Sequence, residues 1–303
     1  MLWKGLPMKF KLSKTVKLMV ITGSICMLLT AFVLMDAFII PKTYEIIEKS
    51  AEDPLLLDIS ASISEYSYKD ENIAILISTV NEDNVVYHIV DIRLSDAEFL
   101  KSAFAKDIYG RNIGETTSQM AVDNKAVLAF NGDFYGSRDD GLIIRNGVLY
   151  RDQPRDAPDN RSLLINEEGD FTFVTEGAVE GESYLTKGII HSLSYGPVLV
   201  EDGKAVKINT RVAQTKNPRT AIGIIEPLHY LLIVVDGRST SSEGMRLDTL
   251  AKLFVRLGAK SAYNLSGGAV STLWFNGKII NNPSVNGLFS DERAISDILF
   301  IGY

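Results

Sequence analysis

Two apolar runs joined by a helix-like segment constrain the fold of this chain more than any other feature. The first run, residues 231–235, leads into Asp236-Gly237-Arg238, and the second ends in Asn264-Leu265-Ser266-Gly267-Gly268. A strand, a crossover helix and a parallel strand in this order commonly place the two strands side by side. Open α/β sheets bind ligands beyond the carboxyl ends of their strands. We therefore expect four side chains to meet at one sheet edge: Asp236, Arg238, Asn264 and Ser266.

The segment between these runs, residues 247–257, has the apolar spacing of an amphipathic helix. Gly258 follows it, as is typical of a helix end. The apolar residues on one face are Leu247, Leu250, Ala251, Phe254 and Leu257. We expect this face to pack against the sheet and to fix the spacing between the two strand ends.

Tight turns elsewhere in the chain predict antiparallel hairpins. Asn146-Gly147, Asp202-Gly203 and Asn276-Gly277 each separate two apolar runs, and such pairs favour the type I′ turn, in which both central residues have positive φ. Residues 72–80 and 85–94 predict strands, whereas residues 95–105, with Ser95 as N-cap and Glu98 in a capping box, and residues 117–124 predict helices. The expected fold class is α+β, with mixed β-sheets, antiparallel hairpins and at least one βαβ crossover.

The amino-terminal 40 residues have the pattern of a membrane anchor. Five lysines and no acidic residue occur in residues 1–17, and residues 18–35 carry no charge. A spanning helix needs about 20 apolar residues, and lysines before the span put the amino terminus in the cytoplasm. A cleaved signal peptide is the alternative, but its apolar region is ordinarily about 7–15 residues long, and no Ala-x-Ala site follows. Cys26 is not in a lipobox, because Ile25 precedes it.

These patterns divide the chain into four parts. We expect a basic cytoplasmic tail at residues 1–17, a transmembrane anchor at 18–40, a charged and partly helical juxtamembrane stalk at 41–60, and an extracellular domain at 61–303. The protein would then span the cell membrane once. No Pro/Gly linker divides residues 61–303, so one exported domain is expected.

The composition of the exported part excludes several classes of function. It has no cysteine, since Cys26 lies in the anchor, so neither disulfides nor thiolate chemistry are expected. Without the five leading lysines, the chain has 26 basic and 38 acidic residues, a net charge of −12. Such a surface is a poor match for nucleic-acid phosphates and for an anionic membrane surface. An anionic ligand would need a local cluster of arginines.

Three further segments carry candidate site residues. In Asn131-Gly132-Asp133, an extended backbone would point the two polar side chains to one face, and an Asx-stabilised turn at a strand end is the alternative. Arg219 and Thr220 stand at the start of a strand, where Arg219 could bind a phosphate through two hydrogen bonds or be a surface arginine. Arg293, before a final strand at residues 294–300, has the same two interpretations.

The histidines argue against several standard chemistries. His88 shares a strand face with apolar residues and is interpreted as a core or edge histidine, His229 lies in a turn, and His191 alone has a plausible site position. No His/Cys grouping has zinc-ligand spacing. The sequence has no Gly-x-Ser-x-Gly elbow, P-loop or dinucleotide fingerprint. A serine hydrolase would therefore have to combine Ser266 with His191.

Five motifs follow one another along the later part of the chain: Asn131-Gly132-Asp133-Phe134, Gly196-Pro197-Val198-Leu199-Val200 with Asp202-Gly203-Lys204, Pro218-Arg219-Thr220-Ala221-Ile222-Gly223, Asp236-Gly237-Arg238 with Gly244-Met245, and Asn264-Leu265-Ser266-Gly267-Gly268. This order resembles that of the phosphodiester glycosidases, which include the catalytic domain of the lysosomal uncovering enzyme and bacterial relatives often labelled exopolysaccharide biosynthesis proteins. The resemblance covers roughly residues 70–303.

The chain departs from that family at one position that bears on activity. The family usually reads Leu-Asp-Gly-Gly-Gly-Ser, whereas Ser266 here replaces the acid and Ala269 replaces the third glycine. If the acid supplies an essential charge, the protein is weakened or inactive. Asp133 could compensate, since the family more often has glycine at that position; this is the hypothesis of a carboxylate moved across the pocket.

The resemblance implies hydrolysis of a sugar-1-phosphodiester, which releases the sugar and leaves a phosphomonoester. The phosphomonoester is a good leaving group, so the site must mainly hold the diester and stabilise an oxocarbenium-like centre. The residues assigned to catalysis are Asp236, Asp133, Arg238 and Ser266. Those assigned to substrate binding are Asn131, Arg219, Thr220, Glu243, Asn264, Gly267, Gly268 and Arg293.

We expect the substrate to be a glycosyl phosphate in a cell-envelope polysaccharide or teichoic-acid-like polymer, with the membrane contacted through the amino-terminal helix and no nucleic acid as partner. The alternative is a catalytically impaired glycan-binding or exopolysaccharide-assembly protein of the same fold, and the serine hydrolase is a third, more distant interpretation. No cofactor and no metal site are assigned. A divalent ion held by carboxylates is left open, although no EF-hand-like loop occurs.

Overall fold

The computed structural model describes residues 13–47, 62–157, 159–208, 213–284 and 291–303. The chain divides into two compact units, Met1–Pro41 and Lys42–Tyr303.

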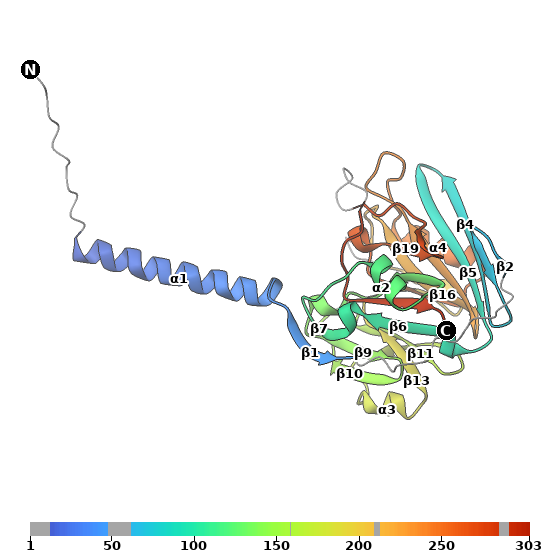
Figure 1. The fold of residues 1–303 in the computed structure, drawn as a ribbon, viewed down its shortest axis with the longest axis horizontal. Coiled ribbons are helices and arrows are strands. Elements are labelled where there is room, and N and C mark those ends of the chain that lie inside the picture. Colours follow the sequence, from blue (N-terminus) through green and yellow to red (C-terminus); the bar gives the residue numbers. More distant parts are fainter. Residues whose placement is uncertain (1–12, 48–61, 158, 209–212, 285–290) are drawn as a thin grey trace, which may run out of the picture. The chain divides into compact units, whose positions relative to one another are not determined.

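The first unit contains helix α1 (Lys14–Phe38), which is 25 residues long (Figure 1). Ser13 caps this helix, because its Oγ accepts a hydrogen bond from the Val16 amide at 3.2 Å. The length and apolar composition of α1 suffice to cross a membrane, and a signal sequence meets the same criteria. The helix therefore agrees with the anchor expected at residues 18–40 and with its alternative.

The second unit is built on a large, mostly central sheet, to which the described residues contribute nine strands (Figure 1). In order across the sheet these strands are β15 (Lys204–Ala205), β14 (Val198–Glu201), β18 (Ser261–Asn264), β16 (Arg219–Glu226), β17 (His229–Val235), β5 (Val85–Leu94), β4 (Ile73–Glu82), β3 (Ser67–Lys69) and β2 (Ser62–Ile63). Neighbouring strands of this sheet pair antiparallel throughout the described part of the chain.

A second sheet faces the first and has five strands among the described residues: β20 (Lys278–Ile279), β19 (Leu273–Phe275), β8 (Leu128–Asn131), β21 (Asp297–Ile301) and β6 (Leu100–Phe104). Three smaller sheets complete the strands. They pair β1 (Lys42–Ile46) with β7 (Ile108–Arg111), β9 (Gly141–Arg145) with β10 (Val148–Gln153), and β11 (Arg161–Asn166) with both β12 (Phe171–Thr175) and β13 (Ile189–Leu193).

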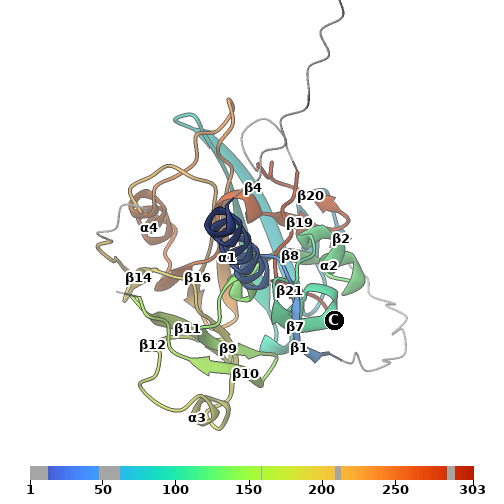
Figure 2. The same ribbon diagram turned by 90° about the vertical axis from the view of Figure 1, so that its left-hand side faces the viewer.

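Two helices of the second unit each cover the outer face of one of the two large sheets (Figure 2). Helix α4 (Leu247–Arg256) packs Leu250 and Phe254 against Ile233 and other residues on one face of the nine-stranded sheet. Helix α2 (Thr117–Asp123) packs against the five-stranded sheet, and the short α3 (Glu182–Leu185) lies beside β10 and β13. The main core lies between the two sheets and includes Val90, Ile222, Leu232, Phe130 and Leu299.

The α+β class and the local turns agree with the sequence analysis, but the expected mixed sheets do not, because the strand pairs of the described residues are antiparallel. The structure is a mixed α+β fold in which Asn146-Gly147, Asp202-Gly203 and Asn276-Gly277 join β9 to β10, β14 to β15 and β19 to β20. All six of these residues have positive φ, as the type I′ turn requires. The helix predicted over residues 247–257 is also confirmed as α4.

Two local predictions were wrong. Residues 95–105 form a 3₁₀ turn at Ala97–Phe99 and then β6, because pairing of residues 100–104 with β21 outweighs the capping pattern. The cap is Asp96, whose side chain accepts from the Glu98 amide at 2.9 Å, and not Ser95. Residues 42–46, within the expected helical stalk, form β1 and pair with β7. Most of that stalk, residues 48–60, lies outside the described residues.

Candidate functional site

The ends of three neighbouring strands form one rim of the nine-stranded sheet. Strands β17 and β18 run parallel, as expected, but β16 lies between them and pairs antiparallel with both. The expectation that they are direct neighbours is therefore wrong. The start of β16 occupies this rim, because Arg219 pairs with Val235 and the Leu265 amide donates to the Thr220 carbonyl at 2.9 Å.

Glycines let the loops of this rim pack closely. A Cβ on Gly237 would lie 2.8 Å from the Pro218 nitrogen, and one on Gly267 would lie 2.9 Å from the Pro218 oxygen. Gly244 has a φ of +91° and is packed against the backbone of Asn217. Side chains other than glycine are excluded from these contacts, so the loops after β17 and β18 are held against the segment that leads into β16.

Arg238 presents an exposed guanidinium at this rim. Its backbone has a φ of +57°, and its Nη2 donates to the Asn217 side-chain oxygen at 3.3 Å. Gly268 lies beneath it with a φ of +71°, and a Cβ there would approach Nη2 to 3.0 Å. A guanidinium with several donors and partial exposure can bind a phosphate through paired hydrogen bonds.

Arg219 lies beside this group but is buried. Its Nε donates to the Met245 carbonyl at 3.1 Å and its Nη2 to the Thr215 carbonyl at 2.9 Å. Burial lowers its pKa, with the charge of Arg238 acting in the same direction and Tyr195 opposing it. Arg219 therefore holds the surrounding loops and adds positive charge next to Arg238.

Asp236 begins the loop after β17 and is also buried, with 6% of its surface exposed. Its Oδ1 accepts hydrogen bonds from the Asn281 side chain at 3.1 Å and from the Asn282 amide at 2.9 Å. Its Oδ2 lies 3.6 Å from Nε2 of His88 on β5. The carboxylate is thus fixed in orientation from both sides.

Asn131 connects the two large sheets beneath the rim. Its Nδ2 donates to the Ser266 carbonyl at 2.6 Å, and its Oδ1 accepts from the Thr220 hydroxyl at 2.7 Å and the Thr272 amide at 3.2 Å. Ser266 is 3% exposed, and its amide donates to the Gly132 carbonyl. The structure therefore brings Asn131, Thr220 and Ser266 together as one hydrogen-bonded group.

Asn264 is the last residue of β18, and only one end of its side-chain amide is hydrogen-bonded. Its Nδ2 donates to the Gly196 carbonyl at 2.8 Å, whereas its buried Oδ1 has no hydrogen-bond partner among the described residues. The side-chain oxygens of Ser271 and Thr272 are buried without a partner in the same part of the chain. Unpaired buried polar atoms are uncommon and are often found where a ligand or water binds.

Asp133 lies in a separate, fully buried charge network. Its Oδ1 is 3.1 Å from Nη2 of Arg145, and that nitrogen lies 2.7 Å from Oδ2 of Asp297. Burial opposes ionisation of Asp133, but Arg145 and Arg138 outweigh it and lower the pKa. Burial and the charge of Asp133 raise the pKa of Asp297 to about 6, although Arg145 opposes them. The side chain of Asp133 is thus occupied by structural partners.

Two residues that the sequence analysis assigned to substrate binding lie at the edge of the candidate site. Glu243 is exposed and forms an ion pair with Lys216, and its Oε1 accepts from Asn84 at 3.1 Å. The hydrogen bond from Lys216 is the main cause that lowers the pKa of Glu243. Arg293 is exposed, with its guanidinium carbon 5.8 Å from the centre of the Phe134 ring.

The structure agrees with the interpretation of His88 as a core histidine, but it does not bring His191 to the candidate site. His191 is fully buried: its Nδ1 accepts from the Asn146 amide at 3.3 Å and its Nε2 lies 2.8 Å from the Leu100 carbonyl. Burial lowers its pKa to about 4, and both ring nitrogens have partners away from Ser266. His88, by contrast, contacts Asp236. Strand register would have indicated this contact, since His88 pairs with Val234, two residues before Asp236.

No group of three or more His, Cys, Asp or Glu side chains that could hold a metal ion occurs within residues 13–47, 62–157, 159–208, 213–284 and 291–303.

Comparisons with known proteins show what this chain is similar to. A family model described as phosphodiester glycosidase matches residues 124–302. The uncharacterized SPbeta prophage-derived protein YomE of Bacillus subtilis is 32% identical over 201 residues, which cover 64% of this chain but only 31% of YomE. The chain thus spans about a third of the length of that relative.

Two solved structures share the fold. The zebrafish N-acetylglucosamine-1-phosphodiester alpha-N-acetylglucosaminidase catalytic domain, auto-inhibited by its pro-peptide, matches with a TM-score of 0.61 and 22% identity, covering 86% of this chain and 87% of that one. A hypothetical protein from Synechocystis matches with a TM-score of 0.53 and 13% identity, covering 76% of this chain and 62% of that one.

Proposed function

Because this chain belongs to the phosphodiester glycosidase family, we propose that it is a membrane-anchored extracellular hydrolase that cleaves sugar-1-phosphodiester linkages in cell-envelope polymers. The observation that carries this proposal is the exposed guanidinium of Arg238, which lies over Gly268 and follows the fixed carboxylate of Asp236 by two residues. A cation for the phosphate and an anion for the sugar centre are the two charges that this reaction requires.

In this mechanism, Arg238 binds the phosphate of the diester, and the positive charge of buried Arg219 assists it. The C1–O bond breaks, the electron pair stays on the phosphate oxygen, and the positive charge that develops on the sugar is stabilised by the carboxylate of Asp236. Water then adds to C1 and loses a proton to the solvent, which gives the free sugar and the phosphomonoester. The hydrogen bonds to Oδ1 of Asp236 restrain that carboxylate, so little reorganisation accompanies the reaction.

The remaining assigned residues either contact the substrate or support the loop that does. Gly267 and Gly268 permit a close approach of the substrate, and Asn264, with its unpaired Oδ1, orients a sugar hydroxyl. Asn131, Thr220 and the backbone of Ser266 support the loop that carries these glycines. Glu243 and Arg293 would contact parts of the substrate further from the cleaved bond.

The test is hydrolysis of UDP-sugars and p-nitrophenyl-phosphoryl sugars by the full chain purified in detergent, with Asp236→Asn as the comparison. Release of free sugar by the wild type, reduced by at least tenfold in the variant, supports the proposal. Equal turnover by both proteins contradicts the role of Asp236.

The hypothesis that Asp133 replaces the missing acid needs a careful substitution. Asp133→Ala would leave Arg145 with one fewer partner in the core, and breaking a buried pair costs on the order of 3–5 kcal/mol, so loss of activity could follow from unfolding. Asp133→Asn keeps the shape and one acceptor. Unchanged turnover in a folded Asp133→Asn protein rules the hypothesis out.

The replacement of the family's acid by Ser266 favours a second candidate, a catalytically impaired glycan-binding or polymer-assembly protein. Binding of a glycosyl-phosphate polymer without any release of sugar would support this function over the first.

A further inference from the structure

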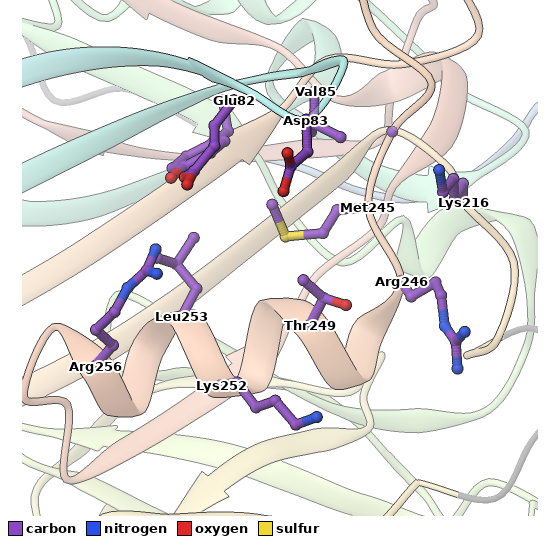
Figure 3. A pocket seen from close by; sticks show the side chains of 12 residues that line it. Glu82, Asp83, Val85, Lys216, Met245, Arg246, Thr249, Lys252, Leu253 and Arg256 are labelled. Carbon is purple, nitrogen blue, oxygen red and sulfur yellow. The ribbon is translucent and has the colours of Figure 1, made fainter.

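A cavity of about 450 Å³ lies between helix α4 and the turn that joins β4 to β5. It is lined by the hairpin, by the loop before α4 and by the stretch of the helix from Thr249 to Arg256 (Figure 3). Its volume is in the range of small-molecule binding pockets. None of the side chains assigned above to catalysis or to substrate binding lines it.

The floor of this cavity is apolar. Val85, Tyr87, Met245 and Leu253 are each less than 10% exposed and belong to the core beneath α4. In Figure 3, Leu253 and Thr249 point from α4 toward Met245 in the middle of the cavity. A surface of this kind suits the C–H face of a sugar or polyol.

The rim carries more positive than negative charge, although the whole chain has a net charge of −7. Four cations, Lys216, Arg246, Lys252 and Arg256, line the cavity together with two carboxylates, Glu82 and Asp83. Lys216 is paired with Glu243, and Arg246 with Asp248.

The other two cations are exposed at the rim. Neither Lys252 nor Arg256 forms a salt bridge with a carboxylate in the described part of the chain. Arg256 extends toward Glu82 (Figure 3). Both side chains interact with the hydroxyl of Tyr87, whose pKa is raised by burial and by Glu82, with Arg256 opposing them. A guanidinium beside a phenol hydroxyl offers several donors to an anion.

One loop connects the cavity with the candidate active site. The segment after β17 begins with Asp236 and Arg238 at the site and ends with Gly244, Met245 and Arg246 in the cavity wall. The Met245 carbonyl accepts from Arg219, and Arg238 donates to Asn217, the neighbour of Lys216. The loop that forms part of the cavity wall is therefore also hydrogen-bonded to residues of the candidate site.

We propose that this cavity is a second subsite, which binds a phosphate-bearing unit of the polymer one or more repeats away from the cleaved bond. The proposal rests on the proposed function. The apolar floor packs against the polyol or sugar of that unit, and Arg256 and Lys252 attract its phosphate. Binding there increases the affinity for a polymer but adds nothing for a substrate with a single phosphodiester.

The test compares two substrates that carry the same sugar-1-phosphate, in the full chain purified in detergent. One is a p-nitrophenyl-phosphoryl sugar, and the other is an oligomer with several consecutive phosphodiesters. Thr249→Trp fills the cavity from an exposed helix position, and Arg256→Gln removes a charge. We expect each variant to raise KM for the oligomer about fivefold, with kcat/KM for the small substrate unchanged.

Matched controls separate this effect from changes in surface charge and bulk. Arg93→Gln removes an exposed arginine at the other end of β5, and Thr172→Trp adds the same bulk on β12. Neither control variant should change the kinetic constants for either substrate. An oligomer KM that is unchanged in Thr249→Trp and Arg256→Gln overturns the proposal.

Turnover of neither substrate by the wild type would contradict the proposed function alone. The subsite is then decided by calorimetric titration with the oligomer. Affinity that falls about fivefold in Thr249→Trp but not in Thr172→Trp supports the subsite, and equal affinity in all proteins overturns it.

Discussion

The imidazole of His88 lies against the carboxylate of Asp236, with 3.6 Å between Nε2 and Oδ2 and both side chains less than 10% exposed. The other ring nitrogen, Nδ1, is 2.9 Å from the Thr79 hydroxyl. Among the described residues, Nε2 forms no hydrogen bond, so the contact with Asp236 is electrostatic. A buried carboxylate needs its charge balanced by donors, so His88 is the side chain that completes the surroundings of Asp236.

We expect His88→Ala to lower kcat about tenfold, because removal of the imidazole, whose Nε2 lies 3.6 Å from Oδ2, leaves the carboxylate of Asp236 free to move from its position. The KM should change little, since His88 is buried behind Asp236 and contacts no substrate. His88→Gln retains a donor in a similar position and should restore part of kcat. Steady-state kinetics of the three proteins check this, and a loss confined to KM would contradict a positioning role.

The Asp133–Arg145–Asp297 network predicts a pH dependence of stability. The pKa of Asp297 is raised from 3.8 to about 6, so the folded state holds a proton that the unfolded state releases between these values. The contribution of Asp297 to the free energy of unfolding therefore falls as the pH rises from about 4 to above 6. Asp133 has the opposite effect on stability, because its pKa is lowered. Its contribution to the free energy of unfolding is lost only as the pH falls below the ordinary pKa of an aspartate.

The side chain in Asp297→Asn cannot ionise, so this variant should lack the part of the pH dependence of the free energy of unfolding that Asp297 causes. Relative to the wild type, its free energy of unfolding should increase between pH 4.5 and pH 7.5 by roughly 1–3 kcal/mol. Urea unfolding at the two pH values measures this. Asp123→Asn, on the surface of α2, serves as the control and should parallel the wild type. Parallel curves for Asp297→Asn as well would disprove the prediction.

Gly268 tests whether the position of Arg238 matters for activity. Gly268→Ala would introduce a Cβ 3.0 Å from Nη2 of Arg238 and should displace the guanidinium, lowering kcat/KM at least tenfold. Its φ of +71° also costs stability, about 1 kcal/mol. Gly203 has the same φ with open space around it, so Gly203→Ala carries the same strain without the contact.

Equal activity of the Gly268→Ala and Gly203→Ala proteins would show that Arg238 does not need this geometry. A fall in activity for Gly268→Ala alone, at similar thermal stability, would assign the loss to the guanidinium.

Local chemistry made much of the fold predictable. Asn-Gly and Asp-Gly pairs specify turns with positive φ, and the apolar face of residues 247–257 specifies α4. Each of these patterns is contained in one short segment of the sequence. The insertion of β16 between β17 and β18 depends on pairing between distant segments. No local pattern contains that information.

The same distinction applies to the site. The rim could be predicted because Asp236 and Arg238 directly follow an apolar strand. The contact of His88 with Asp236, and the burial of Asp133 with Arg145 and Asp297, required the register of β5 and β21. Alternation along a single strand says which residues share a face, but it does not say which strand lies opposite.

Ser266 provides the sharpest test between a weakened hydrolase and a binding protein. It lies directly before the Gly267-Gly268 turn, and its backbone is held by Asn131 and Gly132 at both its carbonyl and its amide. Ser266→Asp therefore introduces the family's usual acid without requiring a new backbone conformation. Arg219 and Arg238 would offset the added charge.

If the missing acid is what limits this protein, we expect Ser266→Asp to raise kcat for p-nitrophenyl-phosphoryl sugars at least tenfold, since a carboxylate that stabilises a developing cation contributes several kcal/mol. Ser266→Asn, of the same size but uncharged, should produce no such gain. If Ser266→Asp folds and still releases no sugar, the rest of the site is not arranged for hydrolysis, and the chain is a binding protein.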